Sequence, residues 1–278
     1  MTPRELLKLL SAEMAAAGVP DAEVDAQLLL SHVTGQNPLN LRLDGWSQVS
    51  LADETAFRAL CEKRKTRTPL QYLTGVQSFL GRDFYVDERV LIPRPETELL
   101  AERAIALLKA SPCPPVSLDL CCGSGCLAVS MALGDARAEV HAADLSKDAL
   151  AVTQQNADRL GAKVRLHQGD LFDALPRMRF NLIVSNPPYI PAADCLELQE
   201  EVRREPMIAL DGGVDGYAFY RRIAADAPRF LEPGGTLLME VGFDQAERVM
   251  ALCQAAGLIP VAIHEDYQHI ARMVEARL

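Results

Sequence analysis

Residues 185–190, with the sequence Ser-Asn-Pro-Pro-Tyr-Ile, constrain this chain more than any other stretch. They follow residues 180–184, Phe-Asn-Leu-Ile-Val, a short apolar run typical of a strand that is buried on both faces. Neither proline can donate a ladder hydrogen bond, so the strand must end at Asn186. Open α/β sheets bind ligands at the carboxyl ends of their strands. The string therefore indicates a ligand site, with a simple proline turn as the structural alternative.

The groups at this corner suit the transfer of a substituent to a planar amide or amino nitrogen. The lone pair of such a nitrogen is delocalised, so its N–H bonds must be held and the lone pair aimed at the electrophile. The side-chain oxygen of Asn186 and the backbone carbonyl of Pro187 can each accept one N–H, and Tyr189 can stack on the planar group. We expect these three residues to be catalytic and residues 186–189, including Pro188, to bind the substrate.

Size and charge narrow the class of protein. The chain has 278 residues, 49% of them apolar, which is enough for two globular domains. No apolar run reaches the length of a membrane span and the first residues do not begin a signal peptide, so we expect a cytoplasmic location. A net charge of −10 argues against a surface that binds nucleic-acid phosphates. The basic run at residues 63–67 is expected to be a solvated helix end, with a contact to RNA or an acidic partner as the alternative.

The cysteines do not form a recognisable metal site. Seven are present, an odd number without the spacing of a disulfide framework. Cys121, Cys122 and Cys126 are the only cluster, and their spacing matches no zinc pattern. We expect small buried thiols and no metal.

The N-terminal part of the chain has helical periodicity. Residues 2–5, Thr-Pro-Arg-Glu, form a capping box with proline at the first helical position. A second helix is expected from Asp21 to Gly35, with Val24, Leu28 and Val33 on its inner face.

A further helix begins near Ser50 and completes a small helical bundle over residues 1–75. Nothing in this bundle has the pattern of a catalytic site, so we assign it to substrate docking. Residues 76–92 are expected to form a β-hairpin linker. Residues 93–278 are expected to form the catalytic domain.

From Val116 onward, strands and helices alternate, which predicts an α/β domain with a largely parallel sheet. The gap between the last two strands is too short for a crossover, so these two should pair antiparallel. The expected strands are Val116–Leu120, Val140–Ala143, Val164–His167, Phe180–Val184, Thr236–Val241, Leu258–Ile263 and His269–Val274.

A second candidate site lies at residues 119–126, Asp-Leu-Cys-Cys-Gly-Ser-Gly-Cys, which follow a strand and open a helix. The two glycines make neither a dinucleotide fingerprint nor a P-loop, and they favour a nucleoside with a small carboxylated tail. Asp144, after the second strand, is placed to bind ribose hydroxyls, and Asp170, after the third, to accept from an adenine amino group. Each aspartate alone could be a helix cap. Together they predict an adenosyl ligand in one crevice, which Asn186 closes.

With both sites identified, the chain resembles the class I S-adenosylmethionine-dependent methyltransferases. More narrowly, it resembles the N5-glutamine methyltransferases that modify the glutamine of the Gly-Gly-Gln loop in bacterial peptide chain release factors. DNA adenine-N6 and cytosine-N4 methyltransferases share Asn-Pro-Pro-Tyr, but the helical front domain and residues 92–98, Ile-Pro-Arg-Pro-Glu-Thr-Glu, narrow the match. The other matching strings are residues 69–75, 119–125, 169–170, 184–190, 205–206, 209–210, 215–216, 219–221 and 233–235.

This resemblance implies a fold, a cofactor and partners. The fold would be α/β, a seven-stranded Rossmann-like class I methyltransferase sheet with six parallel strands and one antiparallel, preceded by the small helical bundle. The methyl donor would be S-adenosyl-L-methionine and the protein substrate a peptide chain release factor. We expect a monomer that binds neither DNA nor membranes.

The resemblance also implies roles for individual residues. Asp144 and the loop from Cys121 through Cys122, Gly123 and Ser124 to Gly125 would hold the methionine and ribose parts of the cofactor. Asp170 and Leu171 would flank the adenine, and Thr97 would lie near the carboxylate end.

The chain departs from the family pattern at two places. Cys121 and Cys122 replace the first two residues of a loop that usually reads Gly-Thr-Gly-Ser-Gly, and Leu171 stands where family members often have tryptophan. A position that needs a positive φ tolerates cysteine poorly. Two other functions stay open at this point, a DNA adenine-N6 methyltransferase and a non-catalytic S-adenosylmethionine-binding adaptor.

Overall fold

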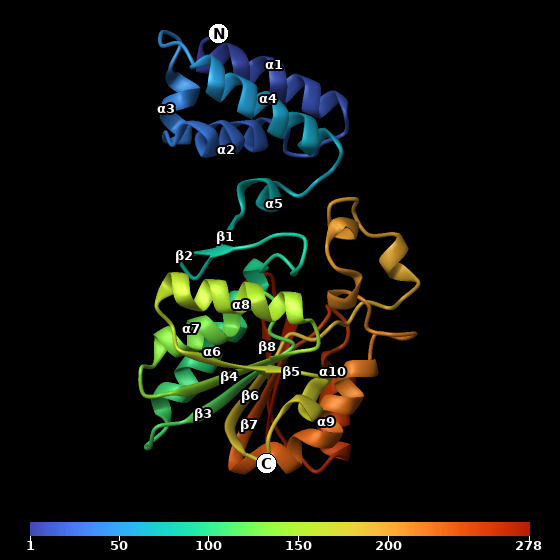
Figure 1. The fold of residues 1–278 in the computed structure, drawn as a ribbon. Coiled ribbons are helices and arrows are strands. Elements are labelled where there is room, and N and C mark those ends of the chain that lie inside the picture. The colour runs from blue at the N-terminus through green and yellow to red at the C-terminus, as the bar shows by residue number, and fades with distance from the viewer. The chain divides into compact units, whose positions relative to one another are not determined.

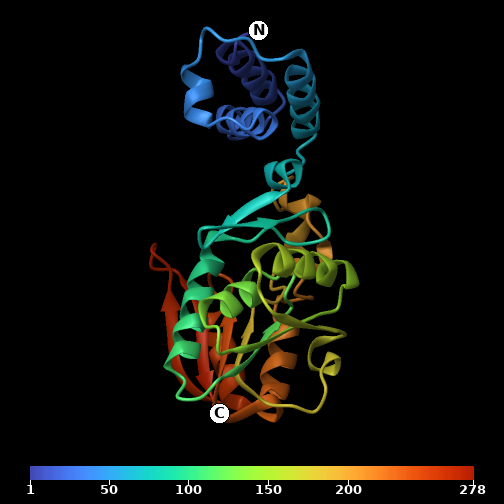
Figure 2. The same cartoon turned by 60° about the vertical axis from the view of Figure 1, so that its left-hand side comes forward.

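The computed structural model describes residues 1–278, with residue 174 described by its backbone alone. The chain divides into two compact units. The first contains Met1–Val76 and Gln199–Arg204, and the second contains Gln77–Leu198 and Glu205–Leu278. Figures 1 and 2 show the elements of each unit from two directions. Among the described residues, no helix is both long enough and apolar enough to span a membrane.

The first unit is helical and has its own apolar core. Its first helix begins with the predicted capping box, in which the Glu5 backbone N–H donates to Thr2 Oγ1 at 3.3 Å and the Thr2 N–H donates to Glu5 Oε2 at 3.0 Å. The helices are α1 (Pro3–Ala16), α2 (Ala22–Thr34), α3 (Pro38–Leu43), α4 (Leu51–Lys65), α5 (Leu70–Thr74) and the short 3-10 helix η3 (Val202–Arg204). Fully buried core side chains include Leu6, Met14, Leu29, Leu30, Leu41 and Phe57.

The predicted inner face of α2 is wrong. Val24 and Leu28 are 54% and 39% exposed, and only Val33 packs partly against the core. The buried face instead carries Asp25 and Leu29, together with Ala26 and Leu30. An aspartate on a buried face escapes a pattern of apolar spacing, because its burial depends on a partner far away in the sequence.

That partner comes from the basic run at residues 63–67. Arg64 is 5% exposed, and its Nε donates to Asp25 Oδ2 at 2.7 Å and its Nη1 to Glu201 Oε1 at 2.9 Å. Arg67 Nη2 also donates to Glu201, at 2.6 Å. Burial favours a neutral Glu201, but hydrogen bonds from the two arginines prevail and lower its pKa to about 2. Arg64 and Arg67 therefore bind acidic residues of this chain, which contradicts the expectation of a solvated helix end for these two.

The second unit is built on a seven-stranded sheet with the order β5-β4-β3-β6-β7-β9-β8. Strand β9 runs antiparallel to both β7 and β8, and the other neighbouring pairs are parallel. Six strands therefore run one way and one the other, which confirms the predicted fold class. The strands are β3 (Val116–Leu120), β4 (Glu139–Asp144), β5 (Val164–Gln168), β6 (Phe180–Ser185), β7 (Leu231–Glu240), β8 (Ile259–Glu265) and β9 (Ala271–Arg277).

Helices cover both faces of this sheet (Figure 1). One face packs against α6 (Pro95–Ala110), α7 (Cys126–Gly134) and α8 (Lys147–Leu160). The other packs against α9 (Ala218–Phe230) and α10 (Ala246–Ala255). The unit also contains the hairpin of β1 (Val76–Phe79), apart from its first residue, and β2 (Arg82–Tyr85). Its 3-10 helices are η1 (Leu171–Ala174), η2 (Asp194–Leu196) and η4 (Met207–Ala209).

Candidate active site

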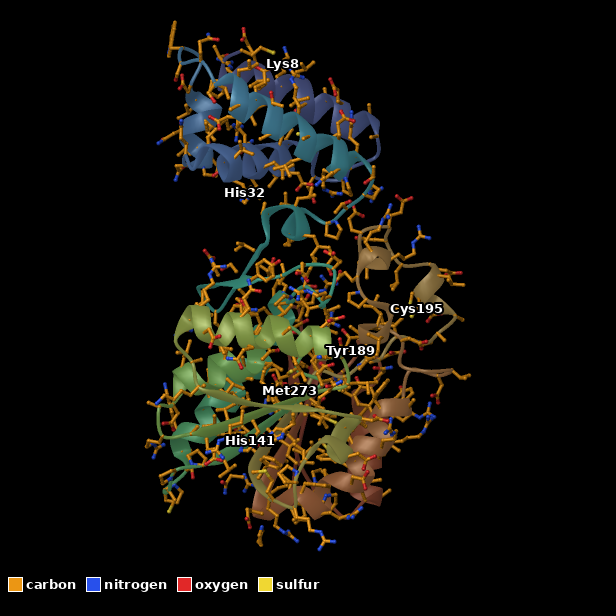
Figure 3. The ribbon with its side chains drawn as sticks, in the orientation of Figure 1. Lys8, His32, His141, Tyr189, Cys195 and Met273 are labelled. Atoms are coloured by element: carbon orange, nitrogen blue, oxygen red, sulfur yellow. The ribbon has the colours of Figure 1, made fainter. Side chains whose placement is uncertain are left out.

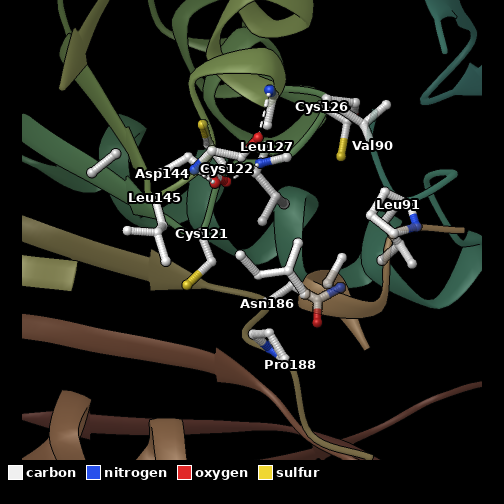
Figure 4. Close-up of a pocket in the computed structure, with 18 of the residues that line it drawn as sticks. Val90, Leu91, Cys121, Cys122, Cys126, Leu127, Asp144, Leu145, Asn186 and Pro188 are labelled. Carbon is white, nitrogen blue, oxygen red and sulfur yellow. Dashed lines mark hydrogen bonds between the residues drawn. The ribbon is translucent and has the colours of Figure 1, made fainter. Parts of the chain in front are cut away.

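A cavity opens at the carboxyl ends of β3, β4 and β6 in the second unit. Strand β3 lies between β4 and β6, so the chain leaves β3 in one direction and returns on its other side. Such a switch point is where open α/β sheets bind ligands. Figure 4 shows Asn186 and Pro188 on one side of the pocket and Cys121, Cys122 and Asp144 on the other. The structure thus brings the two predicted sites together in one cavity.

The Asp144 carboxylate holds the glycine loop, residues 121–125, by a hydrogen bond. Gly123 N donates to Asp144 Oδ2 at 2.9 Å, and Ser146 N donates to Oδ1 at 2.9 Å. Burial raises the pKa of the Asp144 carboxyl, partly offset by these backbone donors. Each carboxylate oxygen keeps acceptor capacity, because each accepts only one of these bonds. A carboxylate at this strand end can therefore both shape the loop and bind hydroxyl groups in the cavity.

Helix α8 supports the same loop from its other side. Thr153 Oγ1 donates to the Gly123 carbonyl at 2.9 Å. Asn156 is fully buried, and its Nδ2 donates to the Ser124 and Tyr85 carbonyls at 2.9 Å each. Its Oδ1 accepts from Tyr85 N at 2.7 Å. One carboxamide therefore ties the glycine loop to the end of β2.

Asn156→Ala is expected to lower the free energy of unfolding by about 3 kcal/mol, because it leaves one buried and two partly buried backbone groups without partners. Urea unfolding followed by circular dichroism measures the change. Gln154→Ala is the matched control, since Gln154 is exposed on the same helix, and we expect it to change stability by less than about 0.5 kcal/mol. Equal stability of the two variants would contradict the role of Asn156.

Each of the two departures from the family pattern includes one residue with a left-handed backbone. Cys121 has a φ of 66° and Leu171 a φ of 50°, and both residues line the cavity. The left-handed conformation brings Cβ too close to the following carbonyl oxygen, and only glycine avoids this cost. The remaining loop positions with positive φ, Gly123 and Gly125, are glycines.

The comparison of Cys121→Gly with Cys121→Ala isolates this backbone cost, because both variants remove the thiol. We expect the glycine variant to be more stable by about 1 kcal/mol in thermal or urea unfolding. The same pair of substitutions at Cys122, which has no positive φ in the described backbone, is the control. There the order should reverse, since glycine loses more conformational freedom than alanine on folding. The same order at both positions would rule out strain at Cys121.

The thiols of the loop are unreactive groups in this environment. Cys122 and Cys126 are buried, and Cys121 is partly buried. Burial raises the pKa of Cys126 to about 12 and also raises those of Cys121 and Cys122, so all three stay protonated near neutral pH. Among the described residues, no group of three or more His, Cys, Asp or Glu side chains is arranged to hold a metal ion.

The side of the cavity assigned to adenine contains Asp170 and Leu171. Asp170 Oδ2 lies 2.8 Å from Arg222 Nη2 in α9, and both side chains are 47% exposed. Leu171 is 8% exposed and packs in the core between the sheet and α9. Apolar contact with a flat ring is therefore available from Leu171, whereas Asp170 shares its carboxylate with an arginine.

Only some residues of the proline corner, residues 186–189, line the cavity. Asn186, Pro188 and Thr97 line it, whereas Pro187, Tyr189 and Gly125 are not among the lining residues. The Tyr189 ring packs partly against the core beside α9 and α10 (Figure 3). Its backbone carbonyl accepts from Gln245 Nε2 at 3.0 Å. Stacking of Tyr189 on the substrate therefore stays a prediction.

A glycine-rich segment packs behind this corner. Ile190 N donates to the Leu210 carbonyl at 3.0 Å, and Gly212 N donates to the Ile190 carbonyl at 2.7 Å. An added Cβ at Gly212 would lie 2.7 Å from the backbone Cα and carbonyl carbon of Tyr189. The backbone of residues 189–190 therefore rests directly on a glycine, with no room for a side chain between them.

Several lining residues had no role in the sequence predictions. They are Arg89, Val90, Leu91, Pro93, Arg94, Pro206, Ile208, Ala209 and Phe219. Most of them lie in or beside segments that match the family, but their residue types alone did not indicate a role in the site. The sequence predictions also gave no individual role to Asp119. It is fully buried, its Oδ2 accepts from Ala128 N at 3.0 Å, and burial raises its pKa to about 7.

The residues present fit an adenosyl cofactor. The buried strand end offers the Asp144 carboxylate for ribose hydroxyls, and Gly123 has open space above its Cα where a ligand can approach the backbone. Helix α7 begins after Gly125, which provides no side-chain cap, and among its first N–H groups Ala128 N donates to Asp119 Oδ2. The positive end of the helix dipole still favours a negatively charged tail at this place.

Comparisons with known proteins show the family of this chain. Residues 5–75 match the PrmC N-terminal domain, and residues 102–203 match the methyltransferase small domain. A release factor glutamine methyltransferase of Geobacter sulfurreducens is 42% identical over 278 residues, which cover 100% of this chain and 97% of that protein. One of Bordetella pertussis is 45% identical over 268 residues, covering 96% of this chain and 98% of that protein.

Among solved structures, a methyltransferase from Pyrococcus furiosus has a TM-score of 0.53 at 16% identity and covers 72% of this chain and 90% of its own. That similarity concerns the fold. A release factor-specific protein-(glutamine-N5) methyltransferase from Alicyclobacillus acidocaldarius is 33% identical, covers 70% of this chain and 98% of its own, and has a TM-score of 0.43.

Proposed function

Because this chain belongs to the release factor glutamine methyltransferase family, we propose that it methylates the side-chain amide nitrogen of the glutamine in the Gly-Gly-Gln loop of peptide chain release factors. The methyl donor is S-adenosyl-L-methionine, and the protein acts in the cytoplasm as a monomer during the maturation of translation termination factors. The observation that carries the proposal is the single cavity in which Asn186 and Pro188 face the glycine loop and Asp144.

In this proposal the chain positions the substrate and does little else. Bound S-adenosylmethionine supplies a methyl group on a positively charged sulfur. Asn186 Oδ1 accepts one N–H of the target carboxamide and the Pro187 carbonyl accepts the other, so the nitrogen lone pair points into the cavity. No strong base is required, because the attacking nitrogen becomes acidic only as the new bond forms. Positioning therefore supplies most of the acceleration.

The family resemblance assigns the cofactor contacts, and all of these residues except Gly125 line the cavity. The loop from Cys121 to Gly125 would hold the methionine part, with Thr97 near its carboxylate, and Asp144 would bind the ribose. Asp170 and Leu171 would flank the adenine. Since Asp170 also pairs with Arg222, the adenine amino group shares that carboxylate with an arginine.

Mass spectrometry of release-factor peptides tests the function directly. After incubation of the protein with a release factor and methyl donor, the peptide that contains Gly-Gly-Gln should gain the mass of one methyl group on its glutamine. The same incubation with duplex DNA tests the adenine-N6 alternative, which the net charge of −10 disfavours. Methyl incorporation into DNA but not into the release factor would overturn the proposal. Calorimetry that detects no binding of S-adenosylmethionine would favour the adaptor.

The helical unit is proposed to dock the release factor. Its surface exposes Leu43 and Trp46, which are 70% and 92% exposed. Apolar side chains of this size on a surface are typical of protein contacts, in which aromatic anchors carry much of the binding energy. The Gly-Gly-Gln loop itself would enter the catalytic cavity, so docking affects only substrates that carry the rest of the release factor.

The double substitution Leu43→Asp and Trp46→Ala tests docking. We expect kcat/KM to fall about 10-fold with a whole release factor and to stay unchanged with a short Gly-Gly-Gln peptide. Ile259→Ala, which alters an exposed apolar residue of β8 in the other unit, is the control and should change neither value. Equal losses with both substrates would contradict docking by this surface.

A further inference from the structure

Glu240 is a buried acid that the mechanism above does not use. It is the last residue of β7 and is 3% exposed. Strand β7 pairs with β6, and Ser185 lies opposite Met239, so Glu240 is one residue beyond that pair, as is Asn186. Thr97, 2% exposed in α6, lies at the same place. Three elements therefore bring a carboxyl, a carboxamide and a hydroxyl together at the edge of the cavity.

The hydrogen bond between Asn186 and Thr97 shows that the amino group of the Asn186 carboxamide is turned inward. Asn186 Nδ2 donates to Thr97 Oγ1 at 3.3 Å. Burial raises the pKa of Glu240, and the nearby polar groups of Thr97 and Asn186 lower it in part. Yet Glu240 Oε2 has no hydrogen-bond partner among the described residues. The Glu240 backbone is fixed by pairing with Met273 and by Tyr220 Oη, which donates to its carbonyl at 3.0 Å.

The Glu240 carboxylate can only accept hydrogen bonds, so it favours the orientation of the Asn186 carboxamide in which the amino group faces it. If the carboxamide were flipped, Asn186 Oδ1 would face the carboxylate oxygens and the amino group would face the cavity. That orientation sets acceptors against one another in a buried place, which is costly. It would also present N–H donors to the N–H donors of the substrate. The observed orientation leaves Oδ1 free to accept.

We propose that Glu240 is a positioning residue, whose buried carboxylate keeps the amino group of Asn186 turned inward and its oxygen turned toward the substrate amide. This inference rests on the proposed function, because it assumes that the substrate donates N–H groups to Asn186. It assigns no contact between Glu240 and the substrate or the cofactor.

The protonation state of Glu240 makes the proposal testable. Burial raises its pKa to about 7, with a smaller raising effect from Glu96 in α6 and lowering effects from Thr97, Arg272 in β9 and Asn186. The other titratable groups that face it are the hydroxyls of Tyr189 and Tyr220 and the thiol of Cys126. Below pH 7 the neutral carboxyl has an O–H donor, which favours the flipped orientation because Asn186 Oδ1 can then accept from it. Above pH 7 only the inward amino group fits.

The first experiment is the pH dependence of kcat for the whole protein with a release factor. In the wild type, kcat should rise as the pH increases through about 7. In Glu240→Gln, which keeps the size but can donate as well as accept, kcat should fall about 10- to 100-fold and lose this rise, while the Kd for S-adenosylmethionine stays within about twofold. Glu275→Gln changes another fully buried acid of the sheet, outside the cavity, and should keep the wild-type pH profile.

The second experiment needs no cofactor. In the wild-type protein, the NMR signals of the Asn186 side-chain amide should shift with pH with a midpoint near 7, and in Glu240→Gln they should not. An unchanged kcat and pH profile in Glu240→Gln, or a loss explained wholly by weaker cofactor binding, would overturn the proposal. These results count only if the wild type methylates the release factor, so a failure of the proposed function appears separately, as no transfer by the wild type.

Discussion

Asn186→Ala is expected to reduce methyl transfer to a release factor by about 1,000-fold or more, with the fold and cofactor binding retained. The substitution removes the acceptor that orients the target amide, and loss of one orienting hydrogen bond at a reacting centre costs about 100- to 1,000-fold. In this variant the target nitrogen would also no longer be oriented toward the methyl group, which lowers the rate further. Transfer from labelled S-adenosylmethionine measures the rate, and calorimetry measures cofactor binding.

Asn181→Ala is the matched control for this variant. Asn181 lies in β6, the strand that precedes Asn186, is exposed, and accepts a hydrogen bond from Val116 N at 2.8 Å. We expect wild-type turnover from it and a loss of stability of no more than about 1 kcal/mol. Turnover at the wild-type rate by Asn186→Ala would refute the role assigned to the proline corner.

Gly212→Ala is expected to reduce kcat about 100-fold, although Gly212 does not line the cavity. The new Cβ would meet the Tyr189 backbone at 2.7 Å, whereas ordinary contacts begin at 3.4 Å, so that backbone must shift by roughly 0.7 Å. A displacement of this size at a reacting centre costs about two orders of magnitude. The affinity for S-adenosylmethionine should change little, because Cys122 and Asp144 lie across the pocket from Asn186 and Pro188 (Figure 4).

Gly45→Ala provides the comparison, since an added Cβ there meets nothing within 4 Å. We expect its kcat and stability to match those of the wild type. If Gly212→Ala also kept full activity, the corner would tolerate backbone movement and would not be the rigid element that the proposed mechanism needs.

Local patterns predicted the parts of the site that depend on where strands end. The sequence placed Asp144 and Asn186 at the ends of two strands because short apolar runs and prolines mark these ends within a few residues. The antiparallel pairing of the last two strands followed from the short connection between them, whereas the count of six parallel strands and one antiparallel strand came from the family resemblance. The doubt about Cys121 also came from the sequence alone, and the structure places that residue at a positive φ.

Contacts between distant segments were beyond local patterns. The buried face of α2 was misjudged because Asp25 is neutralised by Arg64, 39 positions away. Glu240 looked like an ordinary strand residue, since nothing near it in the sequence indicates that Thr97 and Asn186 surround it. The fit of Gly212 under Tyr189 depends on a loop that returns after more than twenty residues. Such features become visible only when the chain is folded.

Glu201 sets a limit on how this protein can be divided into fragments. It belongs to the helical unit through Arg64 and Arg67, but in the sequence it lies between the proline corner and the lining residues Pro206 and Ile208. A fragment that stops at residue 76 would leave the buried Arg64 with Asp25 as its remaining acid. Breaking such a buried network by removing one partner costs about 3 kcal/mol or more. Studies of the helical unit in isolation should therefore graft residues 199–204 onto it.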